Sequence, residues 1–213
     1  MPAPKPRSSE LAYSLLRDMI LDLRLPPGTV VNEQSLSVEL SIGRTPIHEA
    51  IARLASDEFI AVMPRRGTSV TALTLKGVLD IFEAREAIEC GIAYIAALRA
   101  TDDDLAHMES LVESADEARE SADAEKYLLA DYQIHHFLVK MIDNSLLQGA
   151  ADRLLLHNLR LWRFYFSTHH PHDTSMLSHA PLVSALRAND AERAQTLMRE
   201  HIAASRQMLR LLF

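Results

Sequence analysis

The sequence has little of three features that would each define a protein class: cysteine, long apolar runs and an apolar N-terminal segment. Cys90 is the only cysteine, so no disulfide can form within the chain, and a reducing environment is expected. The longest apolar run, 87–98, contains Glu89 and is shorter than the roughly 20 residues that a membrane span needs. Residues 1–8 are basic and lack the apolar core of a signal peptide. We therefore expect a cytoplasmic protein without a membrane partner, whose residues 1–8 form a flexible arm.

The net charge of −7 would at first argue against a nucleic-acid partner. Residues 1–71, however, carry eight Lys/Arg and eight Asp/Glu, and residues 72–213 carry the remaining 14 basic and 21 acidic side chains. The whole negative balance thus belongs to the second part of the chain. A neutral first part with clustered basic groups is compatible with DNA binding through one face, so overall charge does not decide the function.

The apolar pattern predicts a mostly α-helical protein with two domains. The stretch Leu25-Pro26-Pro27-Gly28 ends a first helix, because proline cannot continue one. Residues 59–63 and 68–71 are short β-type runs around a Pro-Arg-Arg-Gly turn, and only helical patterns follow residue 75. The expected helices cover residues 9–23, 33–40, 44–57, 75–99, a segment opening at 102, 123–142, 145–167, 175–188 and 190–212.

Residues 9–72 have the layout of a winged helix-turn-helix, a unit that places a helix N-terminus in the major groove of DNA. On a helical wheel, Ile47 and Leu54 fall on the core side of the third helix, whereas Arg44, Thr45 and His48 share the other side. Arginine in the first turn suits a guanine edge, since its fork matches O6 and N7. The alternative is a polar, solvated face on a three-helix bundle.

The hairpin tip adds weight to the DNA-binding interpretation. Arg65 and Arg66 place two cations at the tip, and Gly67 allows close approach. A winged protein contacts phosphates or the minor groove at this point. We therefore expect these three residues to belong to the DNA interface.

Residues 9–71 resemble the N-terminal domain of GntR-type bacterial transcription regulators. The family pattern around the recognition helix is close to Ser-Arg-Thr-Pro-Val-Arg-Glu-Ala-Leu, and residues 43–51 read Gly-Arg-Thr-Pro-Ile-His-Glu-Ala-Ile. Gly43 replaces a capping residue and His48 replaces an arginine that contacts DNA in the family. Gln34 stands where an arginine is frequent. The resemblance implies that these positions take part in operator recognition.

Four residues of the helical part are candidate metal ligands. Asp131 and His135 are four residues apart and share one helical face. Two later predicted helices each carry a central histidine, His179 and His201. One carboxylate and three imidazoles from three helices suit a divalent cation inside a bundle. The alternative is that these histidines are separate and hydrogen-bonded or exposed.

Residues 76–212 resemble the FadR C-terminal domain (FCD), the effector domain of a large GntR branch. Its pattern includes Arg-x-x-x-Glu, met by Arg85 and Glu89, and Asp-x-x-x-His followed by an asparagine, met by Asn144. The resemblance implies that Asp131, His135, His179 and His201 hold a divalent metal, with zinc first and nickel or manganese as alternatives. It also implies a homodimer and a small carboxylate effector.

Arg85 lies on an apolar stripe of its helix together with Glu89. A buried guanidinium needs a partner, because an unpaired buried charge is costly. One interpretation is an intrahelical pair with Glu89. The other is that Arg85 binds the effector carboxylate, with Asn144 as a second effector-binding candidate.

The combined features predict a metabolite-responsive transcription regulator with an all-helical effector-binding and dimerisation domain at residues 75–212. We expect a repressor that leaves a palindromic DNA operator when a small organic acid binds. One alternative is a metal-dependent enzyme that uses the His3Asp site, for which no nucleophile or general base is evident. Another is a regulator whose metal is purely structural.

Overall fold

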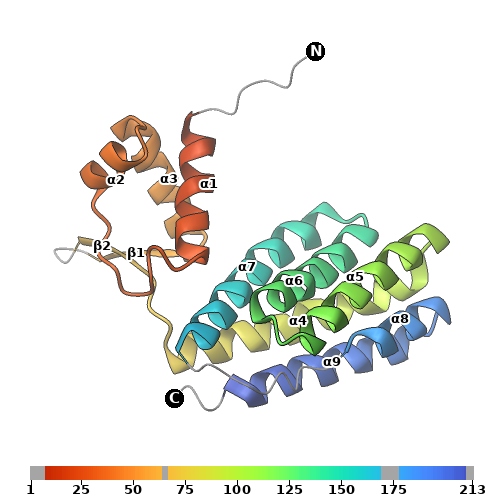
Figure 1. Ribbon diagram of the computed structural model, residues 1–213. Coiled ribbons are helices and arrows are strands. Elements are labelled where there is room, and N and C mark those ends of the chain that lie inside the picture. Colours follow the sequence, from red (N-terminus) through yellow and green to blue (C-terminus); the bar gives the residue numbers. More distant parts are fainter. Residues whose placement is uncertain (1–7, 64–66, 169–177, 210–213) are drawn as a thin grey trace. The chain divides into compact units, whose positions relative to one another are not determined.

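The computed structural model describes residues 8–63, 67–168 and 178–209. The chain divides into two compact units, Met1–Leu73 and Thr74–Phe213. The fold is mostly helical, with a single two-stranded sheet among the described residues, and this confirms the predicted fold class (Figure 1). None of the described helices combines the length and the apolar content that crossing a membrane requires.

The first unit is a three-helix core followed by a β-hairpin. Its core forms where α1 and α2 pack against α3, and it contains Leu16, Ile20, Ile47, Leu54 and Phe59, all buried. Ile47 and Leu54 are on the side of α3 that the helical wheel predicted. The elements are α1 (Ser8–Leu21), α2 (Glu33–Glu39), α3 (Arg44–Ser56), β1 (Ile60–Met63) and β2 (Gly67–Val70).

The hairpin is antiparallel, with Ile60 paired to Val70 and Met63 to Gly67. The segment before α2 joins it, because Val30 forms an isolated antiparallel bridge with Ser69. Gly67 has a φ of +88°, a left-handed conformation that glycine adopts without steric cost. The sequence therefore places a glycine where the chain enters β2.

The second unit contains helices only among its described residues. Several of them begin at a side-chain cap: Thr74 accepts from the backbone N–H of Gly77, and Thr101 forms a capping box with Asp104. Such caps satisfy N–H groups that the helix itself leaves free. The helices are α4 (Leu75–Arg99), α5 (Asp102–Glu120), α6 (Ala124–Met141), α7 (Ser145–Thr168), α8 (Ala180–Arg187) and α9 (Ala191–Met208).

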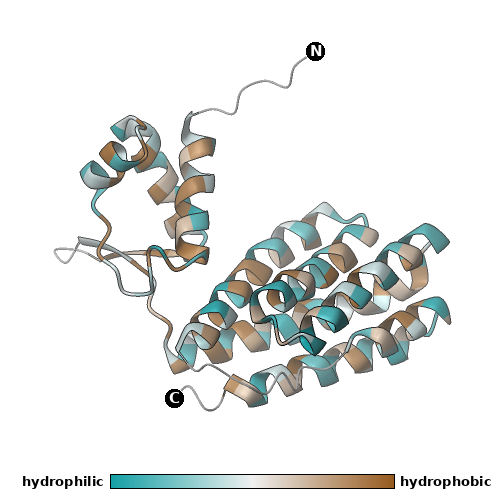
Figure 2. Cartoon of the chain, in the orientation of Figure 1, coloured by the Kyte–Doolittle hydropathy of each residue, from teal (hydrophilic) through white to brown (hydrophobic). Residues whose placement is uncertain are grey.

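Helix α4 lies at the centre of this unit, where it packs against α6, α7, α8 and α9, while α5 packs against α6 and α8. Figure 2 shows apolar residues on the faces that the helices turn toward one another. The interior is nevertheless not purely apolar. Among the described residues, every buried polar or charged side chain belongs to this unit: Arg85, Glu89, Asp131, His135, Asn158, Arg160, His179 and His201.

Several predicted helix ends differ from the structure by one to four residues, and the start of α8 differs by five. The helix expected at 175–188 begins at Ala180 where it is described, and His179 is its N-cap instead of a central residue. Pro181 explains the difference, because proline is tolerated in the first turn and disrupts a helix interior. Residues 1–7 of the expected arm lie outside the described residues, and Ser8 already belongs to α1.

Candidate functional site

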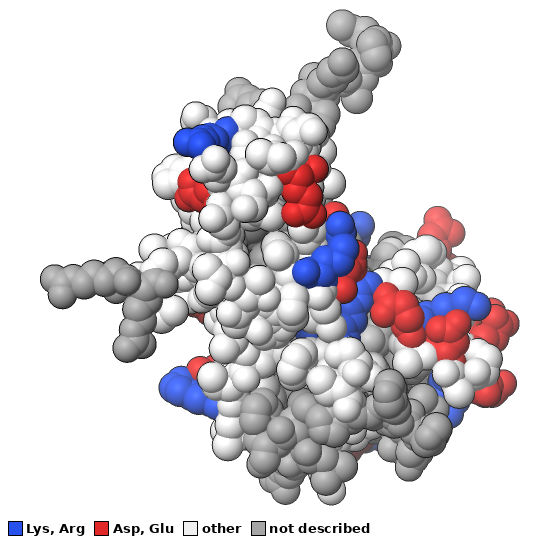
Figure 3. Space-filling model, turned by 60° about the vertical axis from the view of Figure 1, so that its left-hand side comes forward, with Lys and Arg blue, Asp and Glu red and all other residues white. Residues whose placement is uncertain are grey.

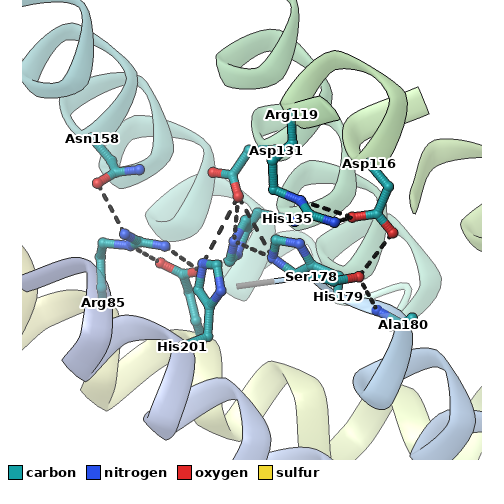
Figure 4. Close-up of polar contacts among 11 residues, drawn as sticks. Arg85, Asp116, Arg119, Asp131, His135, Asn158, Ser178, His179, Ala180 and His201 are labelled. Carbon is teal, nitrogen blue, oxygen red and sulfur yellow. Dashed lines mark hydrogen bonds and ion pairs between the residues drawn. The ribbon is translucent and has the colours of Figure 1, made fainter. Parts of the chain in front are cut away.

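Four buried side chains of the helical unit converge on one point. Asp131 and His135 come from α6, His179 from the start of α8 and His201 from α9. Their candidate ligand atoms all lie within 4.8 Å of one another. The Nε2 atoms of His135, His179 and His201 are 3.7, 3.6 and 3.8 Å from Oδ1 of Asp131. Figure 4 shows the three rings gathered around this carboxylate.

These distances fit a shared cation better than direct hydrogen bonds. They exceed the 2.7–3.2 Å usual for N–H···O bonds, whereas two ligand atoms about 2.1 Å from one ion are about 3.4 Å apart at a tetrahedral angle. The Nε2 atoms of His135 and His179 are 3.3 Å apart, in the same range. The residues present therefore fit a divalent metal, and the expectation that these four would come together holds in the structure.

Glu89 supports the cluster from α4. Its Oε2 lies 2.5 Å from Nδ1 of His135, the ring nitrogen that does not point to Asp131. Burial alone would raise the pKa of Glu89, but the charges of Arg85 and His135 outweigh burial and hold this pKa at about 2. The carboxylate is thus ionised. A carboxylate on the far nitrogen fixes the orientation of a metal-binding imidazole.

Burial favours the neutral form of two of the imidazoles, those of His179 and His201. Burial lowers the pKa of His179 to about 4, against the opposing influence of the Asp131 charge. Burial, together with the neighbouring His179, lowers the pKa of His201 well below its usual value. Neutral imidazole is the form that binds metals, because its lone pair is free.

Arg85 is paired inside the protein. Its Nε donates to Oε1 of Glu89 at 2.6 Å and its Nη1 donates to Oδ1 of Asn158 at 2.9 Å. Burial opposes the charge, but Glu89 outweighs it and raises the pKa of Arg85. The intrahelical pair considered from the sequence is therefore present, and it links α4 to α7 beside the histidines (Figure 4).

The side chain of Asn144 has local backbone partners in the structure. Its Oδ1 accepts from the backbone N–H groups of Leu146 and Leu147 at 3.1 and 3.2 Å, so it caps the first turn of α7. Asparagine is among the preferred residues at this position. An effector contact of Asn144 stays a prediction, and the asparagine that contacts Arg85 in the structure is Asn158.

On the other side of the cluster, α5 holds the segment that carries His179. The hydroxyl of Ser178 donates to Oδ2 of Asp116 at 2.9 Å and accepts from the N–H of Ala180 at 3.2 Å. Asp116 also accepts from Nη2 of Arg119 at 3.1 Å. The position of His179 therefore depends on α5, although α5 provides none of the four ligands.

Sequence reasoning did not single out two buried polar residues of this unit. Asn158 contacts Arg85, and Tyr127 precedes Asp131 by one helical turn on α6. Arg160, on α7, is also buried, with 2% of its surface exposed, and burial lowers its pKa to about 10. The spacing of four residues between Tyr127 and Asp131 was the one available signal.

The candidate DNA-binding residues lie in the first unit. Arg44, Thr45 and Gln34 are exposed at the starts of α3 and α2, and Gly43 caps α3 without a side-chain hydrogen bond. Nδ1 of His48 lies 3.0 Å from Oε1 of Glu33. Arg65 and Arg66 lie outside the described residues. In the view of Figure 3, acidic and basic side chains of the described residues lie side by side without forming a broad patch of one sign.

Comparison with known proteins gives consistent results for both units. The HTH-type transcriptional repressor RspR of Escherichia coli is 26% identical over 190 residues, 89% of this chain and 83% of that protein. The probable D-xylose utilization operon transcriptional repressor of Paenarthrobacter nicotinovorans is 29% identical over 181 residues, 85% and 79% of the two chains. McbR/YncC of E. coli shares the fold, with a TM-score of 0.80 over 98% of this chain and 99% of that one at 19% identity.

Residues 8–70 match the bacterial regulatory proteins of the gntR family, and residues 80–204 match the FCD domain. The second match alone covers more than half of the chain. The matched domains and the named relatives are those of transcription regulators, so they indicate a regulator and do not support the enzyme alternative. The chain belongs to the GntR family of DNA-binding bacterial transcription regulators and carries an FCD domain as its second unit.

Proposed function

We propose that this regulator is a homodimeric repressor that binds a palindromic operator and is released from it by a small carboxylate bound at a metal centre. The buried Asp131–His135–His179–His201 cluster carries this proposal. The two relatives named as repressors support the direction of regulation. A dimer suits a palindrome because two-fold protein symmetry is matched by two-fold symmetry of the site.

The charges of the cluster favour both a divalent cation and an anionic ligand. The formal charges of the groups in contact there are +1 for Arg85 and −1 each for Glu89 and Asp131, when the three imidazoles are counted in the neutral form that binds a metal. Without a cation the sum is −1, which is costly in a buried site. A divalent ion changes the sum to +1. A monocarboxylate then makes the site neutral.

The four side chains would hold the ion through three imidazole nitrogens and one carboxylate oxygen, a mixed set that suits zinc first, with nickel or manganese as alternatives. A bound ion would supply a Lewis-acid position for a ligand oxygen. Glu89 keeps His135 turned toward the centre, and Arg85 keeps Glu89 ionised. Two N–H groups of Arg85 are not used by the hydrogen bonds to Glu89 and Asn158, so the guanidinium retains donors for a carboxylate.

Operator release by carboxylates tests this proposal. The operator duplex is first selected by the protein from random sequences, and its dissociation is then followed by fluorescence anisotropy. We expect a series of small carboxylic acids to include one that releases the zinc-loaded protein and does not release the chelated protein. If an acid releases the operator equally from the zinc-loaded and the chelated protein, the role of the ion is purely structural. Release by no acid in the series would contradict the carboxylate effector.

Arg44→Ala should weaken specific operator binding by about 1–3 kcal/mol. The reason is that Arg44 is exposed in the first turn of α3, where a recognition helix reaches base edges. Binding to the selected duplex and to a scrambled duplex is compared by anisotropy. Arg24→Ala, which removes another exposed arginine of this unit, is the control. Unchanged affinity and sequence preference for Arg44→Ala would mean that α3 does not read the operator.

Glu33→Gln should strengthen operator binding by about two- to fivefold at low salt, because it removes a negative charge beside the DNA-facing His48. The advantage should shrink as salt rises. Glu113→Gln makes the same change on exposed surface of α5 in the other unit and should have no effect. If Glu33→Gln bound more weakly than the native protein, the contact would instead position His48 for recognition.

A further inference from the structure

Tyr127 is a buried tyrosine of α6 whose hydroxyl makes no hydrogen bond to the described residues. The residue is only 2% exposed, and its Oη has no hydrogen-bond partner among the residues that the structure describes. Buried hydroxyls are usually hydrogen-bonded, and an unsatisfied one costs free energy. Such a group is explained if its partner arrives from outside the chain.

The position of Tyr127 places it next to the metal cluster. It precedes Asp131 by four residues and His135 by eight on α6, so the three side chains share one helical face. The charges that act on its phenol are those of Asp131, Arg119, Asp116 and Arg85. Figure 4 shows Arg85 on one side of the cluster, Arg119 and Asp116 on the other, and Asp131 within it.

The phenol remains a hydrogen-bond donor. Burial raises the pKa of Tyr127, and the Asp131 charge adds to this effect. A protonated phenol has one O–H to donate and lone pairs to accept. Its ligand partner must therefore be an oxygen or nitrogen atom that reaches this buried hydroxyl.

The nearby charges favour a neutral partner over a second anionic group. Arg119 is paired with Asp116, and Arg85 is paired with Glu89. Among the described residues whose charges act on Tyr127, both cations are thus already in ion pairs, and a second carboxylate placed at Tyr127 would face Asp131. Like charges repel. A ligand hydroxyl at this place meets no such penalty.

We propose that Tyr127 determines the effector class: its hydroxyl binds a hydroxyl group of the ligand, so that the regulator prefers a hydroxycarboxylic acid to the unsubstituted acid. This inference rests on the proposed carboxylate site and names the part of the ligand that the metal cluster does not select. Tyr127 is then a specificity-determining residue of the effector site. The hydroxyl that is unsatisfied in the free protein is satisfied in the complex.

The proposed role of Tyr127 is tested with pairs of acids that differ by one hydroxyl and with two Tyr→Phe variants. Acetate and glycolate, propionate and lactate, and succinate and malate each differ by one hydroxyl. Their affinities for the full-length, zinc-loaded protein are measured by calorimetry for the native chain, Tyr127→Phe and Tyr132→Phe. Tyr132 is on the same helix but stacks on His136, so Tyr132→Phe is a control for the loss of a phenol.

For at least one pair, we expect the native protein to bind the hydroxy acid about tenfold more tightly. Tyr127→Phe should lose this preference and bind the unsubstituted acid as the native protein does, whereas Tyr132→Phe should keep the preference. Without ligand, Tyr127→Phe should melt at the same or a higher temperature, since it removes an unsatisfied hydroxyl.

Four results would overturn the proposal. If both acids of every pair bind equally to the native protein, or if Tyr127→Phe keeps the preference, Tyr127 does not select the ligand, and the carboxylate site still stands. If ligand-free Tyr127→Phe is destabilised, the hydroxyl already has a partner. If no acid binds the zinc-loaded native protein, the carboxylate part of the proposed function is wrong, and the role of Tyr127 is wrong with it.

Discussion

Glu89→Gln is expected to lower the free energy of unfolding of the helical unit by about 3–5 kcal/mol, because it leaves the buried Arg85 without its counter-charge. The native pair is short, with Nε of Arg85 2.6 Å from Oε1 of Glu89, and both side chains are almost fully buried. Glutamine keeps the size of the side chain and removes only the charge. Asn158, which is neutral, cannot compensate for that loss.

The measurement uses the single tryptophan of the chain. Trp162 is buried in α7, so its fluorescence during denaturant unfolding reports on the helical unit. Chelated protein is used, so that metal binding does not contribute. Glu109→Gln is the control, since Glu109 pairs with Arg187 where both side chains are about half exposed, and exposed pairs contribute about 0–1 kcal/mol.

A double replacement completes this test. Arg85→Met combined with Glu89→Leu removes both charges and should recover most of the lost stability, because an apolar pair of similar volume often replaces a buried ion pair without loss. If Glu89→Gln and Glu109→Gln lower the free energy of unfolding by the same small amount, the buried Arg85–Glu89 pair contributes no more to stability than an exposed pair.

Removal of metal is expected to have the second large effect. A ligand that binds only the native state adds about 4 kcal/mol of stability when its concentration is a thousand times its dissociation constant. Chelation of purified protein should therefore lower the melting temperature, and zinc should restore it. His179→Ala removes one of four ligands from three helices and should melt at about the temperature of the chelated native protein, with no response to zinc.

The neighbouring histidine provides the control for this experiment. His136 follows the ligand His135 directly but contacts Asp152, with Nε2 and Oδ1 3.4 Å apart. His136→Ala should therefore keep the zinc response. His179→Ala should still bind operator DNA, since the winged unit contributes none of the ligands. A native protein that contains no metal and neither binds nor responds to added zinc would contradict the metal centre.

Much of the fold follows from local sequence features. The apolar stripe of α3 and the hairpin signal around Gly67 predicted elements within a residue or two of those observed. α4 lies exactly where the pattern predicted it, from Leu75 to Arg99. The start of α8 was missed because the apolar period extends before Pro181, whereas the backbone requirement of proline decides where the helix begins.

The ligand residues were predictable to a greater extent than their surroundings. The four-residue spacing of Asp131 and His135 places both on one helical face, and this relation is local. The contact between Arg85 and Asn158 spans 73 positions, and no pattern along the chain indicates which helices meet. The resemblance to the family motif indicated Asn144, which caps α7 in the structure, and it gave no signal for Asn158.

Helix α8 has only eight residues, and a helix this short is unstable by itself in water. It therefore depends on its neighbours, and its N-cap is one of the four proposed ligands. Local opening of a protein occurs first where a segment has little stability of its own. A bound ion would hold α8 at its N-cap, so that the free energy of metal binding acts on a segment with little stability of its own. Metal binding would then slow the local opening of α8 at metal concentrations that do not yet change the stability of the whole unit.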